Sequence, residues 1–315
     1  MRLIREASDW QIPDNGVCAA IGVFDGIHLG HQEVILHTVA EARRQSASSV
    51  VITFDRHPNS VVAPERNPAL IYPLSQKLRV IESLGVDAIR LIHFDRPFSL
   101  QTAEAFVLSL ARDFGRVHSV CVGSRFTFGH ERAGNTALLR KLGAQLGFAT
   151  HALPPVTLGN HAVSSTRIRE AIRTGELLQA SGLLGRPYGF AATVVPGDRL
   201  GRQLGFPTAN LAVDGLVLPP RGVYVVEALW RGAHHSGVLN IGFRPSLRRP
   251  EPELRTELHL LDFTGDLYDQ EVEIRFDRKL REEIKFPSLE ALRAQIARDI
   301  AVARTPKTPR SGVNL

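Results

Sequence analysis

Gly22-Val23-Phe24-Asp25-Gly26-Ile27-His28-Leu29-Gly30-His31 is the stretch on which the predicted fold depends. It follows the apolar run from Cys18 to Ile21 and precedes apolar residues at helical spacing, which indicates a strand, a glycine-rich turn and a helix. Two imidazoles three residues apart share one face of the first helical turn, where free backbone N–H groups attract anions. Glycines also let a bulky ligand approach the backbone closely. The stretch therefore predicts a cradle for nucleotide phosphates.

The first half of the chain alternates between two kinds of segment. Apolar runs predict strands at Cys18–Phe24, Val50–Phe54, Ala88–Phe94, Ser119–Val122 and Ala149–Leu153. Amphipathic segments predict helices at Gln32–Gln45, Leu74–Leu84, Thr102–Arg112 and Asn135–Leu146. This order favours βαβ units and a parallel, doubly wound sheet. Ligands of such sheets bind beyond the carboxyl ends of the strands, where the opening stretch falls.

Two other predicted strands are followed by conspicuous stretches. Thr53-Phe54-Asp55-Arg56-His57-Pro58 comes after the second strand, and a turn closed by proline is its simpler interpretation. Gly123-Ser124-Arg125-Phe126-Thr127-Phe128-Gly129 comes after the fourth. Its two aromatic residues between glycines suit a flat ring ligand, or they anchor a loop.

A second helix start offers another anion site. In Val163-Ser164-Ser165-Thr166-Arg167-Ile168-Arg169, either serine is an ordinary N-cap. Hydroxyls, free N–H groups and two arginines at one helix start attract phosphate. A helix terminus alone holds an anion by about 0.3–1 kcal/mol, so a triphosphate needs the arginines and histidines as well.

The pattern changes after Leu184-Gly185-Arg186-Pro187. Short alternating strands are predicted at Ala191–Val195, Gly222–Leu229, Ser236–Ile241, Thr256–Leu261 and Gln270–Phe276, with one later helix at Ser288–Ala301. This is typical of a small antiparallel barrel or sandwich with a C-terminal helix. We place the domain boundary near Leu184 and expect residues 304–315, which have few apolar side chains, to form a mobile tail.

The second domain has its own concentrated motif, residues 197–210. Gly197, Gly201 and Gly205 again suggest backbone close to phosphate, while Thr208 and Asn210 offer neutral oxygens on one side of an extended segment. Neutral oxygens together with nucleotide phosphates are a common way to hold magnesium. A proline-led turn is the competing interpretation.

An alternating segment follows at residues 256–263. If Leu258 and Leu260 face the core, Glu257 and His259 face the other side. A carboxylate there could accept a proton from an alcohol during phosphoryl transfer, although most glutamates on strands are only solvated.

Composition excludes several classes of protein. Hydrophobic residues make up 43% and charged residues 22% of 315, which is ordinary for a soluble globular protein of two domains. The net charge of +6 suits small anionic substrates as well as nucleic acid, and without a basic block in the body of the chain we do not expect nucleic-acid binding. Cys18 and Cys121 lie in apolar runs and are interpreted as core residues in a reducing cytosol. No apolar stretch is long enough to span a membrane, so a cytoplasmic protein without a membrane partner is expected.

Taken together, these motifs resemble the bacterial bifunctional riboflavin kinase/FAD synthetase family, from about Ile12 to Asp299. The opening stretch resembles the nucleotidyltransferase signature of the FMN adenylyltransferase half, and Ser164-Ser165-Thr166-x-x-Arg169 is similar to a second phosphate motif. Gly205-Phe206-Pro207-Thr208-Ala209-Asn210 resembles the flavokinase metal site. Thr256-Glu257 with Asp266-Leu267-Tyr268 resembles the segment that carries the catalytic glutamate.

The resemblance implies two ATP-dependent reactions. Riboflavin is phosphorylated to FMN in a β-barrel domain at residues 185–303, with Glu257 as base and Mg²⁺ on Thr208 and Asn210. FMN is then adenylylated to FAD, with release of pyrophosphate, in an α/β doubly wound nucleotidyltransferase domain at residues 1–184, where His28 and His31 stabilise charge. ADP is the other product, FMN and FAD are substrate and product and not redox cofactors, and the oligomeric state is open.

The remaining site residues are assigned by ligand. The ATP-binding set is Gly22, Phe24, Asp25, Gly26, Gly30, Ser164, Ser165, Thr166, Arg167, Arg169, Gly197, Gly201 and Gly205. The flavin-binding set in the first domain is Asp55, His57, Pro58, Phe126 and Phe128.

Four positions depart from the family pattern. Arg125 stands where the family usually has Asp or Asn, and Asn135 stands where Asp is usual. Ser246 replaces a threonine, and Asp269 stands where glycine is common. Asp tolerates a left-handed backbone better than most residues, so we expect it to be accommodated. None of the four is a phosphate or metal position, and both activities are expected. Two alternatives remain open. One is a different nucleotidyltransferase with the HxGH motif, which is His28-Leu29-Gly30-His31 in this chain, and the other is a non-enzymatic flavin-binding regulator.

Overall fold

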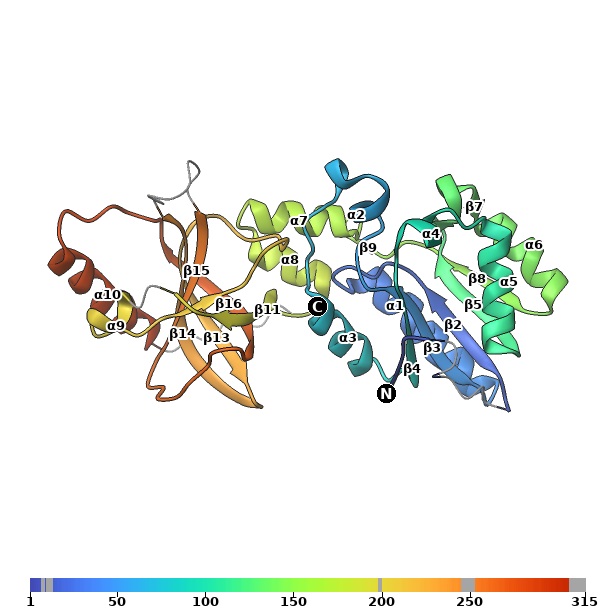
Figure 1. The fold of residues 1–315 in the computed structure, drawn as a ribbon, viewed down its shortest axis with the longest axis horizontal. Coiled ribbons are helices and arrows are strands. Elements are labelled where there is room, and N and C mark those ends of the chain that lie inside the picture. Colours follow the sequence, from blue (N-terminus) through green and yellow to red (C-terminus); the bar gives the residue numbers. More distant parts are fainter. Residues whose placement is uncertain (7–8, 10–13, 198–199, 245–252, 306–315) are drawn as a thin grey trace. The chain divides into compact units, whose positions relative to one another are not determined.

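The computed structural model describes residues 1–6, 9, 14–197, 200–244 and 253–305. The chain forms two compact units, drawn in Figure 1. The first comprises Met1–Glu170 with Gln179–Arg186, and the second comprises Ala171–Leu178 with Pro187 and the residues after it. Ser246 and residues 306–315 of the expected tail lie outside the described residues.

The first unit is built on a six-stranded parallel sheet. Its strand order is β1-β4-β3-β2-β5-β8, with β1 (Arg2–Ile4), β2 (Val17–Ile21), β3 (Ser48–Phe54), β4 (Ala88–Ile92), β5 (Val117–Gly123) and β8 (Ala149–Leu153). The order reverses beside β2, because β3 pairs with one edge of β2 and β5 with the other. The predicted doubly wound α/β fold is therefore confirmed.

Helices connect these strands. The long ones are α1 (Leu29–Arg44), α3 (Leu74–Ser83), α5 (Ala103–Phe114), α6 (Thr136–Leu146), α7 (Ser165–Arg173) and α8 (Leu177–Leu184). The short elements are α2 (Asn59–Val62), η2 (Pro64–Arg66), α4 (Arg96–Ser99) and η3 (His130–Arg132), with two-stranded pairs of β6 (Thr127–Phe128) with β7 (Gly134–Asn135) and β9 (Thr157–Leu158) with β10 (His161–Ala162). None of the helices in the described residues has the length and apolar character that crossing a bilayer requires.

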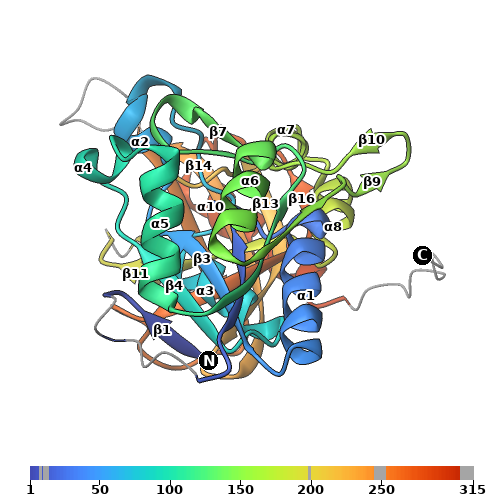
Figure 2. The same ribbon diagram turned by 90° about the vertical axis from the view of Figure 1, so that its right-hand side faces the viewer.

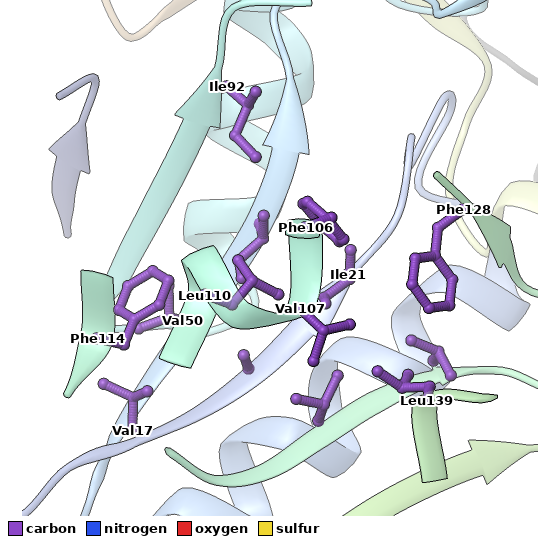
Figure 3. Packing of buried hydrophobic residues seen from close by; sticks show 14 of the residues in the cluster. Val17, Ile21, Val50, Ile92, Phe106, Val107, Leu110, Phe114, Phe128 and Leu139 are labelled. Atoms are coloured by element: carbon purple, nitrogen blue, oxygen red, sulfur yellow. The ribbon is translucent and has the colours of Figure 1, made fainter. Parts of the chain in front are cut away.

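Alternation along the central strands assigns side chains to two faces of the sheet. Val17, Ala19 and Ile21 of β2 pack with residues of α5 and α6 in the large hydrophobic cluster shown in Figure 3. In Figure 2, α5 and α6 lie in front of the strands. Cys18 and Cys121 are fully buried free thiols outside that cluster, as expected for core residues.

Three local differences from the sequence-based expectations have physical causes. Strand β2 ends at Ile21 and not at Phe24, because Phe24 has a φ of 51° and leaves the extended conformation. Strand β1 was not expected; it is three residues long, pairs in parallel with β4 and packs Ile4 in the hydrophobic cluster. Helix α8 was also missed, since its eight apolar and small residues have weak helical periodicity.

The second unit is a closed antiparallel barrel. Its order is β11-β12-β15-β14-β13-β16, with β11 (Gly189–Val195), β12 (Ala209–Leu211), β13 (Gly222–Trp230), β14 (Ala233–Arg244), β15 (Glu253–Leu260) and β16 (Glu271–Arg281). Pairing of β16 with β11 closes it. The predicted barrel is confirmed, and the turn Arg231-Gly232, with φ of 48° and 81°, lets β13 and β14 pair further than expected because this backbone follows the strand twist. A short helix, α9 (Leu200–Gln203), and the C-terminal helix α10 (Leu289–Ala303) complete the unit.

Side-chain caps start several helices. Thr102, Asn135 and Ser288 accept backbone hydrogen bonds at the starts of α5, α6 and α10. Asn135 accepts from both Ala137 and Leu138 at 3.0 Å, so its departure from the family pattern keeps an N-cap. Asp269 has a φ of 59°, the left-handed conformation expected of it.

Replacing Asn135 tests the capping role. Asn135→Ala should lower the free energy of unfolding by about 1 kcal/mol, because two backbone donors lose their acceptor. Asn135→Asp should leave it unchanged or slightly raise it, since a carboxylate also accepts and complements the helix dipole. Urea denaturation followed by circular dichroism measures both, with Asn160→Ala on an exposed loop as control. Equal stability of the Asn135→Ala and wild-type proteins would contradict the assignment.

Candidate functional site

The turn between β2 and α1 lies where the strand order reverses. It follows the carboxyl end of β2, whose two neighbours in the sheet are β3 and β5. Ligands of doubly wound sheets bind in the crevice at this reversal. The HxGH stretch is thus in the position that the sequence analysis expected.

His28 and His31 form a stacked pair at the start of α1. Their ring centroids are 3.6 Å apart with 18° between the planes. His28 is the N-cap, and its Nδ1 accepts the backbone N–H of His31 at 3.3 Å. Because Nδ1 accepts, a neutral His28 ring carries its proton on Nε2, where it can donate to a ligand. Nδ1 of His31 is buried and has no hydrogen-bond partner among the described residues.

Both imidazoles are electrically neutral at pH 7. Burial lowers the pKa of His28 to about 4. Burial, and then the neighbouring His28, lowers the pKa of His31 well below its usual value. The pair therefore offers ring N–H donors, and not fixed charges, to an approaching phosphate.

The backbone of the turn is strained. Phe24, Gly26 and Ile27 have positive φ values of 51°, 78° and 36°, and the two non-glycine residues hold a conformation that costs of order 1–3 kcal/mol each. A Cβ on Gly26 would also lie 2.9 Å from the Ile71 side chain. On Gly22 and Gly30 a Cβ would contact the Phe24 and His28 rings. The turn persists only because its surroundings hold it.

Asp25 and Arg169 supply one such restraint. Arg169, the fifth residue of α7, donates to the Asp25 carboxylate at 2.5 Å and to the carbonyl of Ala69 at 2.7 Å. Asp25 also accepts the N–H of Ile71. Both members are buried, at 5% and 7% exposure, so the pair fastens the turn to α7 and its charges face each other. Burial raises the pKa of Asp25 and Arg169 opposes that rise.

The second phosphate motif lies against the same turn. Ser165 donates to the carbonyl of Asp25 at 3.0 Å. Ser164 accepts the backbone N–H of Arg167, whose guanidinium donates to the carbonyls of His161 and Ala162. Thr166 is exposed at the helix start. The two stretches predicted to form anion sites are thus brought together, although the arginine side chains bind protein atoms.

Two cations that the sequence analysis missed also hold this turn. Lys77 of α3 donates to the carbonyls of Phe54 and Val23. Arg186 donates to the carbonyls of Gly26, Ile27 and Leu184 and lies over the Tyr72 ring. Neither belongs to a motif, and lysine in an amphipathic helix or arginine beside a proline gives no local signal of such a contact.

An aromatic pocket of about 810 Å³ opens beside the turn. Phe126 and Phe128, predicted to lie near the flavin, line it with ring centroids 5.3 Å apart and nearly parallel planes. His57 and Pro58 line it as well, and burial lowers the pKa of His57 to about 4. Asp55 does not line it. Its carboxylate binds His93 at 2.7 Å and the backbone N–H of Phe94, which ties the end of β3 to the residues after β4.

Charged side chains occupy the rim of this pocket. Arg66, Arg96 and Arg132 line it, and none of these was assigned from the sequence. Arg125 is exposed and is not among the lining residues, so this departure from the family pattern leaves the pocket wall unchanged. Glu131 lines it as well, so the pocket combines aromatic side chains with three arginines and one carboxylate, which suits a flat ring bearing a phosphate.

The barrel carries a second, smaller pocket of about 340 Å³. Glu257 of β15 is the ladder neighbour of Asn210 on β12 and of Asn240 on β14, and all three line it. Leu258 and Leu260 are buried while Glu257 and His259 are half-exposed, which confirms the predicted alternation. Thr208 also lines the pocket. The backbone carbonyl of Pro207 lies 2.8 Å from Nδ1 of His259 and forms a hydrogen bond with it.

Glycines cradle the neutral oxygens of this site. A Cβ on Gly197 would lie 1.9 Å from Nδ2 of Asn210, and one on Gly201 would lie 2.9 Å from Oγ1 of Thr208. Gly205 has a φ of 88° in the turn after α9. Within the described residues there is no group of three or more His, Cys, Asp or Glu side chains that could hold a metal. Thr208 and Asn210 therefore suit a cation that takes most of its remaining ligands from water and phosphate.

One group of residues that line the barrel pocket forms an apolar wall. It includes Ile284, Phe286, Leu292, Ile296 and Ile300, of which the last three belong to α10. The sequence analysis missed this wall, and it also missed the ion pair that fixes it. Arg281 at the end of β16 binds Asp299 of α10 through two nitrogens at 2.8–3.1 Å, and Gln295 donates to the same carboxylate.

Comparison with known proteins assigns both halves of the chain to one bifunctional family. The sequence model for FAD synthetase matches residues 11–167, and the one for riboflavin kinase matches residues 184–306. The bifunctional riboflavin kinase/FMN adenylyltransferase of Escherichia coli K12 is 39% identical over 306 residues, covering 96% of this chain and 97% of the relative. The chain belongs to this family. Relatives of the same name from Pseudomonas fluorescens and Haemophilus influenzae are 37% and 36% identical, over 98% and 96% of this chain and 99% and 98% of theirs.

The same two-unit fold occurs in a solved structure. A chain described as a macrolide-efflux protein from Streptococcus pneumoniae is 29% identical, with a TM-score of 0.79 over 96% of this chain and 98% of its own. Family membership excludes the alternative of a different HxGH nucleotidyltransferase.

The buried histidines make stability depend on pH. The folded pKa of His28 is about 4, below its ordinary value of 6.5, so the unfolded chain binds more protons between these values. Its contribution is present above pH 6.5 and is lost as pH falls toward 4. Between pH 7 and pH 5 the loss should be about 2 kcal/mol for this residue. Urea denaturation of wild type and His28→Gln at both pH values should show a smaller loss in the variant; equal losses would contradict the assignment.

Proposed function

We propose that the chain converts riboflavin to FMN in the barrel and FMN to FAD in the first unit, each step consuming ATP. The observation that carries the proposal is the barrel register. It sets Glu257 beside Asn210, in a pocket that is also lined by Gly201, by Thr208 and by apolar side chains of α10. Such a pocket suits a flat apolar ring, an alcohol and a triphosphate.

In the kinase step, the flavin ring lies against α10 and the ribityl chain extends toward Glu257. Glu257 accepts the proton of the terminal hydroxyl, the oxygen forms a bond to the γ-phosphorus, and the bond from that phosphorus to ADP breaks. Thr208 and Asn210 would hold Mg²⁺, which would neutralise phosphate charge. Gly197, Gly201 and Gly205 leave room for the nucleotide to approach the backbone closely.

In the adenylyl-transfer step, the FMN phosphate is already an anionic nucleophile. Its oxygen attacks the α-phosphorus of ATP, and the bond to the β-phosphate breaks to release pyrophosphate. His28 donates from Nε2 and His31 from its ring to oxygens that gain charge as phosphorus becomes five-coordinate. Ser164, Ser165 and Thr166 offer hydroxyls and N–H groups at the start of α7 to the same nucleotide.

The remaining assigned residues shape the backbone, hold the phosphate-binding stretches or bind the flavin ring. Gly22, Gly26 and Gly30, with Phe24, shape the backbone against the nucleotide, while Asp25, Arg167 and Arg169 hold the two phosphate-binding stretches in place. Phe126, Phe128, His57 and Pro58 receive the FMN ring, and Asp55 orders the loop that carries His57. The free buried thiols Cys18 and Cys121 suit the reducing cytoplasm, where we place both reactions.

Replacing the proposed base separates the two steps. Glu257→Gln should slow FMN formation by about 10²–10⁴ while FAD formation from supplied FMN persists, because the base serves only the barrel. Chromatography of riboflavin incubated with ATP and magnesium measures the first step, and the same assay started from FMN measures the second. Glu176→Gln, at an exposed position of the second unit, is the matched control. Equal loss of both steps would refute the two-site assignment, and unchanged riboflavin with the wild type would leave only a flavin-binding regulator.

Removing the first imidazole should do the reverse. His28→Ala should slow FAD formation from FMN by about 10²–10³, as expected when one donor to a developing charge is lost, and spare riboflavin phosphorylation. His161→Ala, at an exposed position of β10 in the same unit, should leave both rates unchanged. FAD synthesis at the wild-type rate in His28→Ala would show that this ring does not serve the reaction.

A further inference from the structure

Lys77 is the most enclosed cation of the first unit that no motif explains. Its side chain is buried at 8% exposure. The ammonium donates to the carbonyl of Phe54 at 2.6 Å, to Oγ1 of Thr53 at 3.2 Å and to the carbonyl of Val23 at 3.4 Å. These acceptors come from the end of β3 and from the turn after β2. Val23 and Phe54 also line the aromatic pocket, so Lys77 joins the pocket wall to the HxGH turn from behind.

All three acceptors of Lys77 are neutral. No carboxylate in the described residues forms an ion pair with it; the Asp25 carboxylate of the turn binds Arg169 instead. Arg186, on the other side of the turn, likewise donates only to carbonyls. The three cations around Val23–Ile27 therefore face two carboxylates, Asp25 and Asp55, whose charges act on Lys77, which leaves a formal net charge of +1.

Such an arrangement is costly in the absence of a ligand. A buried charge without a counter-ion is destabilising even when its hydrogen bonds are made. Lys77 is also the fourth residue of α3, near the positive end of that helix dipole. An excess of buried positive charge at the reversal of strand order would be balanced by a bound polyphosphate.

We propose that Lys77 is a positioning residue for adenylyl transfer, which fixes the HxGH turn against the end of β3 and whose charge is balanced by the triphosphate of ATP. The inference rests on the proposed function of the first unit. Lys77 acts through the turn and touches no substrate itself.

The surroundings of Lys77 make its charge titratable. Burial lowers its pKa to about 8. The ionisable groups that act on it or feel it are Asp25 of the turn, Asp55 and His57 after β3, and His31 of α1. Burial lowers the pKa of both histidines below this range, whereas the pKa of Lys77 falls within it, so Lys77 is the group that we expect to change charge. Adenylylation should then decline as pH rises through about 8.

The test uses the full-length chain and three variants. Lys77→Met removes the charge with little change in length, Lys77→Arg keeps a charge that does not titrate, and Lys141→Met on the exposed face of α6 is the matched control. The rate of FAD formation from FMN is measured at limiting ATP from pH 6.5 to pH 9.5. Circular dichroism of each variant reports that the chain is folded, and riboflavin phosphorylation by the same molecules reports that the barrel is active.

Lys77→Met should lower kcat/KM for ATP at pH 7 by about 10–100-fold, below the loss for a group that contacts the reacting atoms. It should lose the decline above pH 8, so that its rate meets that of wild type near pH 9.5. A merely structural lysine would not produce this convergence. Lys77→Arg should also lack the decline while keeping more of the rate at pH 7, and it decides the matter alone if Lys77→Met does not fold.

Two results would overturn the inference. One is folded Lys77→Met that adenylylates FMN within twofold of wild type at pH 7. The other is the same decline above pH 8 in Lys77→Arg as in wild type. Failure of the wild-type chain to make FAD at all would instead refute the proposed function, so the two outcomes are distinguishable.

Discussion

Stabilisation of one strained turn by residues remote in sequence underlies the first site. Phe24 and Ile27 hold positive φ values, which cost free energy. The compensation comes from Ile71, Arg169 and Arg186, which bind the turn from separate segments of the chain. As a result the free N–H groups at the start of α1 are fixed in place before a ligand arrives, so little free energy is spent on ordering them when it binds.

The second site depends on strand register. Asn210, Glu257 and Asn240 are side by side because β12, β15 and β14 pair in one register around a closed barrel. A shift of one residue would turn Glu257 into the core and Leu258 into the pocket. Burial of Leu258 and Leu260 on the inner face therefore determines where the outer carboxylate points. In the first unit, side-chain contacts to the backbone do the same work.

Local patterns in the sequence were sufficient for the architecture. Apolar runs located the central strands, and helical periodicity located helices whose predicted first residues, Thr102, Asn135 and Ser288, are their N-caps, because both signals involve residues close together in the chain. The sequence motifs also located the HxGH turn and Glu257. The partners of those motifs could not be predicted: Lys77, Arg186 and the Arg281–Asp299 pair act through contacts that only the tertiary structure creates. Strand β1 escaped for the same reason, since three residues carry too little pattern and only its pairing with β4 defines it.

The division of the chain between the two units is interleaved. Residues 171–178 belong to the second unit, yet residues 179–186 return to the first and end at Arg186, which holds the HxGH turn. Each unit is therefore formed by two separate segments of the chain. Recombination at a single crossover near residue 170 would give a descendant whose adenylyl-transfer turn is held by an arginine from the other parent. This sets a constraint on how such chains can exchange halves during evolution: the last eight residues of the first unit have to be inherited with the turn they support.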